Sequence, residues 1–313
     1  MDELEVAIIG GGPAGLTAGL YAARARRRTV LWEGGVLGGQ IAMASRVENY
    51  PGFPDGVEGP ELALAMHEQA ERAGLELRYE PVRALRREGS AFVVEAESGD
   101  VRARCVIVTV GGAHRTLGVP GEAELTGHGV SSCATCDAHF FAGQPIAVIG
   151  GGDAALDEAL FATRYAARVH VVHRSRVLRA SAVLQERAAA EPKIAFERCA
   201  VVERVLGDGE VSGLALRAAA DGTEGMRELA VSAAFIFIGQ QPATAPLRGL
   251  LELDGGGHAP VNAWMETALP GLFCAGAARA GSARQVVTAA GDGATAGIAA
   301  DRYLRDRLVG EVG

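Results

Sequence analysis

The sequence predicts an α/β protein of two domains, one inserted into the other, and three observations carry this expectation. Near the start of the chain a short apolar run ends in glycine and is followed by an alanine-rich stretch and a second apolar run, which is the pattern of a βαβ unit. The same pattern returns 140 residues later, measured from Gly10 to Gly150. The length of 313 residues also favours two domains. A βαβ unit repeated at this distance indicates two nucleotide-binding domains and not a short-period repeat.

The elements are expected in the following order. The first unit has a buried strand over 6–10, a helix over 15–26 and a strand over 29–33. The second unit has a strand over 145–150, a helix over 154–167 and a strand over 169–172. Further β segments are predicted at 92–95, 101–110, 234–238 and 272–275, and a last helix at 285–308.

Glycine-bearing segments near 111–120 and 239–246 are candidates for the two crossings between the domains. We therefore expect one domain over 1–113 plus 244–313, with the second domain inserted at 114–243. The predicted fold class is α/β with two Rossmann-like dinucleotide-binding domains.

The composition excludes several classes of protein. Hydrophobic residues make up 49% of the chain, which supplies a packed core, and the formal net charge of −8 argues against nucleic acid or an anionic membrane as a partner. No apolar run reaches the ~18 residues of a transmembrane helix. Asp2, Glu3 and Glu5 stand where a signal peptide carries positive charge, so a cytoplasmic location, where thiols stay reduced, is expected.

The first glycine cluster is a G-x-G-x-x-G motif between a predicted strand and a predicted helix. Its glycines allow backbone N–H groups to approach a pyrophosphate at the start of the helix. Glu33 ends the next strand, where an acid accepts hydrogen bonds from ribose hydroxyls. The alternative is a tight turn with no ligand. The candidate nucleotide-binding residues are Gly10, Gly12, Pro13, Ala14, Gly15 and Glu33.

The second glycine cluster stands in the same context but lacks the acid. Its second strand ends in His173-Arg174, and Arg179 follows. A cation at this point accommodates the 2′-phosphate of NADP, so NADP(H) is the expected nucleotide. A solvated basic turn is the alternative. The candidate residues are Gly150, Gly152, Asp153, Ala154, Ala155, His173, Arg174 and Arg179.

Cys133-Ala-Thr-Cys136-Asp137 is the predicted chemical centre. Cysteines at i and i+3 on a helical turn bring their sulfurs within disulfide range and support thiol–disulfide exchange. Three alternatives are a zinc site, two unrelated core cysteines and a structural disulfide. Zinc needs a second ligand pair, and His139 adds one ligand at most, so no metal is expected. Asp137 is the candidate acid/base, with capping of a helix as its alternative role.

Together these motifs resemble low-molecular-weight, bacterial-type thioredoxin reductases over essentially the whole chain. The glycine turn at 10–15 resembles the family's FAD-binding turn. Segments 38–40 and 48–52 resemble those that wrap the flavin, and 132–137 matches the redox motif closely. The turn at 150–155 with His173-Arg174 resembles the NADPH site. Further FAD contacts implied by the resemblance are Gly39, Gln40, Asn49, Gly276, Ala277, Arg284 and Gln285.

The resemblance implies a function. NADPH reduces FAD, FAD reduces the Cys133–Cys136 disulfide, and the dithiol reduces a protein disulfide, expected to be that of thioredoxin. Cys136 is expected against the flavin, Cys133 attacks the partner, and Asp137 is the acid/base. The family's NADPH domain is inserted into its FAD domain, the two domains rotate relative to each other, and the enzyme works as a homodimer.

The sequence departs from the family pattern at three places. Ala277 stands where the family has an acid that binds the FAD ribityl chain, and Ser175 stands where it has a second arginine. Ala138-His139 replaces a glycine and an aromatic residue after the redox motif.

These departures keep other functions open at this point. One is a dithiol oxidase that passes electrons from a small dithiol through FAD to oxygen. Another is a ferredoxin-linked thioredoxin reductase. The intact glycine turn at 150–155 argues against this function. A flavin-binding redox sensor without catalysis is the third.

Overall fold

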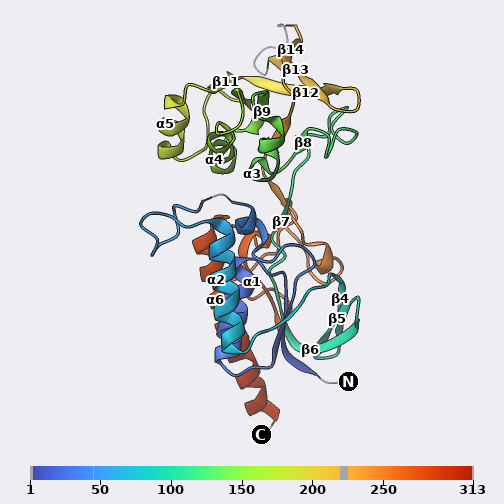
Figure 1. Cartoon of the computed structure of the whole chain (residues 1–313). Coiled ribbons are helices and arrows are strands. Elements are labelled where there is room, and N and C mark those ends of the chain that lie inside the picture. Colours follow the sequence, from blue (N-terminus) through green and yellow to red (C-terminus); the bar gives the residue numbers. More distant parts are fainter. Residues whose placement is uncertain (1–2, 45, 219–224, 312–313) are drawn as a thin grey trace. The chain divides into compact units, whose positions relative to one another are not determined.

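The computed structural model describes residues 3–44, 46–218 and 225–311 (Figure 1). Contacts between Cα atoms divide the chain into two compact units. Unit 1 comprises residues 1–113 and 241–313, and unit 2 comprises residues 114–240. The chain crosses between the units twice, at strands β7 (Gly112–His114) and β16 (Gln240–Pro242), which pair as a two-stranded sheet.

Unit 1 is built on one sheet with the order β3-β2-β1-β6-β5-β4, and β17 also pairs with β6. The strands β1, β2, β3, β6 and β17 run parallel, while β4 and β5 are antiparallel to their neighbours. The parallel strands β1 and β2 are almost wholly buried, as expected for strands covered on both faces. The strands are β1 (Leu4–Ile9), β2 (Thr29–Trp32), β3 (Glu76–Arg78), β4 (Val82–Glu88), β5 (Ala91–Ala96), β6 (Gly99–Val108) and β17 (Leu272–Cys274).

Three helices of unit 1 lie side by side along the sheet: α1 (Pro13–Arg24), α2 (Gly59–Ala73) and α6 (Val286–Glu311) (Figure 1). The helices α1 and α6 approach so closely that a Cβ atom on Gly293 would lie 2.1 Å from the carbonyl oxygen of Ala14. Only glycine allows this crossing. Single turns of 3-10 helix complete the unit at η1 (Gly39–Met43), η3 (Ala245–Leu247) and η4 (Gly276–Ala278).

Unit 2 contains a five-stranded parallel sheet with the order β11-β10-β9-β15-β8 and a separate antiparallel sheet of β12, β13 and β14. Its helical elements are α3 (Ala134–Asp137), η2 (Ala138–Phe141), α4 (Asp153–Ala162) and α5 (Ala182–Ala190). The strands are β8 (Val130–Ser131), β9 (Pro145–Gly150), β10 (Arg168–His173), β11 (Ile194–Arg198), β12 (Ala200–Gly207), β13 (Val211–Ala218), β14 (Arg227–Ala230) and β15 (Ala234–Phe237).

The structure confirms the predicted fold class, with a βαβ unit in each half, and corrects one helix. The helix expected over 154–167 ends at Ala162. Thr163 closes it, because its hydroxyl donates to the carbonyl of Leu160 at 2.7 Å, and the chain then turns so that Ala167 N–H reaches the carbonyl of Gln144. Within the described residues, no helix is both long enough and apolar enough to cross a membrane.

Candidate active site and nucleotide-binding turns

The glycine turn between β1 and α1 is closed on its inner side and open on its outer side. A Cβ atom on Gly15 would lie 1.9 Å from the carbonyl oxygen of Gly10, and Gly10 itself has a φ of +106°. A Cβ atom on Gly12, by contrast, would meet nothing within 4 Å. Gly12 begins α1 without a side-chain cap, and Pro13 occupies the first turn. The free N–H groups and the open space fit a pyrophosphate.

Glu33 lies beside this turn, just after the end of β2. Its carboxylate accepts hydrogen bonds from the N–H groups of Gly11 at 2.5 Å and Gly35 at 2.6 Å. These bonds fix the carboxylate against the glycine turn, at the place where the motif requires an acceptor for ribose hydroxyls.

Other candidate residues of unit 1 converge on the same turn. A Cβ atom on Gly39 would lie 3.4 Å from the Cα of Gly12, and one on Gly276 would lie 3.0 Å from the Cβ of Ala14. Segments far apart in the sequence therefore meet at the start of α1, as a site for an extended dinucleotide requires.

The polar candidates of unit 1 are already hydrogen-bonded. Asn49 Nδ2 donates to Gln285 Oε1 at 3.1 Å, and Gln40 Nε2 donates to the carbonyl of Gly112 at 2.9 Å. Arg284, at a φ of +57°, contacts His258 Nε2 at 3.2 Å.

Ala277 contributes no polar side chain, but a carboxylate that the sequence reasoning missed lies close by. Asp292 of α6 is buried and accepts from the N–H of Gly276 at 3.1 Å and from Arg279 Nε at 2.6 Å. The only signal for it in the sequence is its place on the helix that follows Gln285.

The second glycine turn, between β9 and α4, repeats the open geometry of the first. A Cβ atom on Gly152 would meet nothing within 4 Å, and Gly152 begins α4 without a side-chain cap. Gly151 must be glycine because the His173 ring lies under it, 2.7 Å from a Cβ atom placed there. Asp153 Oδ1 accepts from the N–H of Ser181 at 2.6 Å. This turn also fits a pyrophosphate.

His173 is buried at the carboxyl end of β10, among arginines. Burial lowers the pKa of His173, and the positive charges of Arg179, Arg174 and Arg198 lower it further. The ring is therefore neutral near pH 7. Arg174 and Arg179 are exposed at this edge of the sheet. Arg198, which sequence reasoning missed, reaches the same edge because β11 pairs with β10 in the register His173–Arg198.

Cys133 and Cys136 form a disulfide at the start of α3. Cys133 is buried, with 9% of its surface exposed, whereas Cys136 is exposed. The N–H of Cys136 donates to the Sγ of Cys133 at 3.1 Å. An exposed disulfide sulfur can take part in exchange with a second thiol.

Asp137 follows directly, half-buried, and its backbone N–H donates to the carbonyl of Cys133 at 3.2 Å. It stands at the start of η2 but makes no side-chain capping bond there. The Asp137 carboxylate therefore does not cap this helix, and helix capping was the alternative to its acid/base role.

One further carboxylate reaches the redox motif. Glu158 of α4 accepts two hydrogen bonds from Thr135, the residue before Cys136. Sequence reasoning missed it, although its spacing from Ala155 and Ala162 places it on the buried face of the helix.

The other cysteines have no redox partner in the described part of the chain. Cys105 and Cys274 are buried, and burial raises the pKa of both thiols, that of Cys274 to about 12. The described residues contain no group of three or more His, Cys, Asp and Glu side chains arranged to hold a metal ion.

Comparisons with known proteins agree on one family. The model of the family described as "Pyridine nucleotide-disulphide oxidoreductase" matches residues 4–293. A thioredoxin reductase of Streptomyces coelicolor is 47% identical over 306 residues, covering 97% of this chain and 94% of that protein. One of Mycolicibacterium smegmatis is 45% identical over 304 residues, covering 97% of both. The crystal structure of Lactococcus lactis thioredoxin reductase, described as the FR conformation, matches with a TM-score of 0.94 and 38% identity, covering 97% of this chain and 99% of that one.

Proposed function

Because the chain belongs to the pyridine nucleotide-disulphide oxidoreductase family, and within it to the low-molecular-weight thioredoxin reductases, we propose that it reduces thioredoxin with electrons from NADPH. The electrons pass through FAD to the Cys133–Cys136 disulfide and from the resulting dithiol to the thioredoxin disulfide. The observation that carries this proposal is the disulfide itself, which lies in the same unit as the second glycine turn.

The two cofactors are assigned to the two predicted domains, whose second boundary, after residue 243, lies three residues beyond the boundary between the compact units, after residue 240. FAD is assigned to residues 1–113 plus 244–313, because the open turn at Gly12, the Glu33 carboxylate and the Gly39 and Gly276 segments converge there. NADPH is assigned to residues 114–243, because Gly152 is open and cations gather at the end of β10. When bound, FAD supplies a two-electron carrier between nicotinamide and disulfide.

The two cysteines have separate roles in this proposal. Reduction of the disulfide takes two electrons and two protons and breaks the S–S bond. The sulfur of Cys133 would then attack the thioredoxin disulfide to form a mixed disulfide, and Cys136, which would face the flavin, would resolve it. Asp137 gives and takes the protons. Oxidised enzyme and reduced thioredoxin result.

The alternative functions are not favoured. A ferredoxin-linked enzyme has no use for the open turn at Gly152 and the arginines beside His173. A redox sensor without catalysis does not need an exposed disulfide followed by an acid. A dithiol oxidase differs in the final acceptor, which is oxygen, and the test below separates the two.

The nucleotide preference and the electron path are tested together. Anaerobic NADPH is expected to bleach the flavin absorbance, and oxidised thioredoxin is then expected to restore it. Bleaching by NADH should be slower, because Arg174 and Arg179 would face the 2′-phosphate of NADPH and no acid there would accept from a free ribose diol. Recovery of the absorbance with oxygen but not with thioredoxin would identify an oxidase instead.

The variant Arg174→Ala sharpens this test. It is expected to lower kcat/KM for NADPH by about 10- to 150-fold, since a hydrogen bond to a charged group contributes about 1.5–3 kcal/mol. The value for NADH should change little. Arg168→Ala, an exposed arginine at the opposite end of β10, is the matched control. A wild-type enzyme that prefers NADH would contradict the NADPH assignment.

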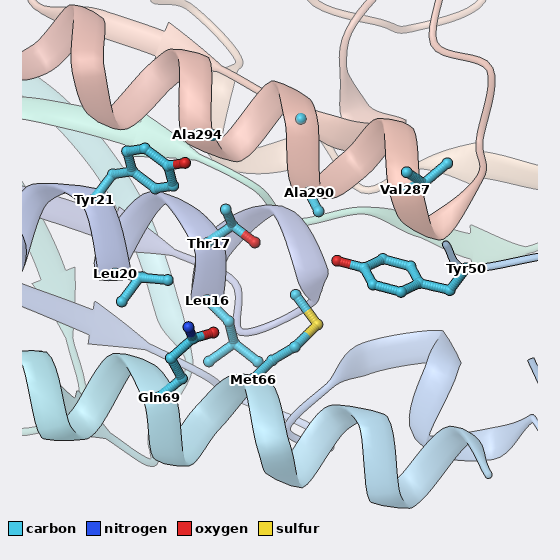
Figure 2. A pocket seen from close by; sticks show the side chains of 11 residues that line it. Leu16, Thr17, Leu20, Tyr21, Tyr50, Met66, Gln69, Val287, Ala290 and Ala294 are labelled. Carbon is cyan, nitrogen blue, oxygen red and sulfur yellow. The ribbon is translucent and has the colours of Figure 1, made fainter. Parts of the chain in front are cut away.

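A homodimer is proposed as the working form, with its interface on α1, α2 and α6. Side chains of these helices, together with Tyr50, line a partly polar groove of about 440 Å³ (Figure 2). Tyr21 and Val287 at this groove are each 40% exposed. Large apolar side chains gathered on one face are typical of an interface. The occupant proposed is a second copy of this chain, as the family resemblance implies.

The mass of the protein in solution tests the dimer. Light scattering at micromolar concentration is expected to give twice the 32.3 kDa of one chain. Tyr21→Glu should shift the protein toward the monomer, because a symmetric contact buries the new charge twice. Tyr79→Glu introduces the same charge at a tyrosine that is 65% exposed outside the groove and should leave the mass unchanged. A monomeric wild type would refute the proposal.

A further inference from the structure

Glu158 is a buried carboxylate for which the reaction as described above has no use. It lies on α4 with 9% of its surface exposed, among the buried residues Ala155, Ala159 and Ala162. A charge in such surroundings is unfavourable unless hydrogen bonds compensate for the lost water. On the buried face of the helix, the Glu158 carboxylate therefore needs hydrogen-bond donors.

Those partners belong to the redox motif. The carboxylate accepts from the backbone N–H of Thr135 at 2.8 Å and from the Thr135 hydroxyl at 3.1 Å. Thr135 is one of the two residues between the cysteines. Burial raises the pKa of Glu158 above its ordinary value, although the Thr135 hydrogen bonds act in the opposite direction by favouring the charged form. Two donors on one carboxyl group match the ionised state.

The next amide along the chain, that of Cys136, is directed at a sulfur atom of the disulfide. The N–H of Cys136 donates to the Sγ of Cys133 at 3.1 Å, one residue after the N–H that Glu158 accepts. Successive amides of one helical turn point in the same direction, so the carboxylate and the sulfur share the same end of the turn. When the disulfide opens, a thiolate formed there has a negative charge as its neighbour.

We propose that Glu158 is a positioning residue of the redox centre, which holds the Cys133–Cys136 turn through Thr135 and by its charge disfavours thiolate in the reduced form. A like charge close by favours the neutral thiol. The reduced state is then less stable relative to the disulfide, and the dithiol is a stronger reductant. The inference rests on the redox role proposed for the cysteine pair.

Glu158→Gln tests the charge with little change of shape. The holoenzyme is equilibrated in dithiothreitol redox buffers at neutral pH, and its dithiol fraction is counted by maleimide labelling. The equilibrium constant for reduction is expected to rise about 3- to 10-fold, which corresponds to about 14–30 mV for a two-electron couple. Alkylation of the reduced pair by iodoacetamide should accelerate by a similar factor, because more of the thiol is ionised.

Three variants separate charge from shape. Thr135→Val removes the hydroxyl donor but leaves the carboxylate charged, so it should not raise the equilibrium constant, and Glu158→Asp should stay near wild type for the same reason. Glu186→Gln removes an exposed charge from α5 and should change nothing. If Glu158→Gln does not fold, Glu158→Ala carries the same expectation.

The outcomes also distinguish this inference from the proposed function. An equilibrium constant and an alkylation rate that stay at wild-type values in Glu158→Gln would overturn the role of Glu158. Equal changes in Glu158→Gln and Thr135→Val would show that Glu158 acts only through the shape of the turn. They would overturn the role of its charge. Neither measurement uses NADPH or thioredoxin, so failure of the proposed electron path would appear only in the anaerobic titration.

Discussion

Replacing either Cys133 or Cys136 with serine is expected to abolish reduction of thioredoxin, because a disulfide needs both sulfurs. The loss should reach the detection limit of the assay, whereas both variants should fold and retain FAD, since the glycine turn at Gly10–Gly15 lies in the other unit. Cys199→Ser is the matched control. Cys199 is a free, partly exposed cysteine of the same unit, and its loss should leave turnover unchanged.

Absorbance spectra of the two variants assign the sulfurs. If Cys136 is the flavin-facing residue, Cys133→Ser leaves a Cys136 thiolate that gives a long-wavelength charge-transfer band with oxidised FAD. Cys136→Ser should show no such band. Within their own unit Cys136 is exposed and Cys133 is buried, and the spectra decide which of the two sulfurs faces the flavin. The opposite pattern of bands would exchange the two roles.

The parts of the site that sequence predicts well are those determined by local sterics. The motif at Gly10–Gly15 requires glycine because a Cβ on Gly15 would collide with the carbonyl of Gly10, so the spacing in the sequence and the turn in the structure have the same cause. The disulfide can also be predicted from the local sequence, because Cys133 and Cys136 are three residues apart.

The residues that sequence reasoning missed reach the site through tertiary packing. Arg198 arrives through the register of β11 against β10, Asp292 through the crossing of α6 over α1, and Glu158 through the packing of α4 on α3. None of the three stands in a motif with fixed spacing. Glu158 left a signal as an acid at the helical spacing of buried alanines, and Asp292 left only its place on the last helix.

Asp137→Asn is expected to slow thioredoxin reduction by about 10²- to 10⁴-fold, the range for loss of a general acid/base. An unperturbed thiol has a pKa of about 8.5, so near neutrality a leaving sulfur is released more readily when it receives a proton. Thiol release and attack on the partner need that proton to move in opposite directions, which a carboxyl group beside the pair can provide. Asp137 directly follows Cys136 and makes no capping bond that would occupy its carboxylate.

The variant should affect only the steps that involve the dithiol. Flavin bleaching by NADPH is expected to stay near the wild-type rate, because that step does not need the cysteines, and FAD content and melting temperature should also stay near wild type. Asp208→Asn, at an exposed turn of the same unit, is the control. Near-wild-type turnover in Asp137→Asn would remove the acid/base role. Another proton donor beside the disulfide would then have to take over this role.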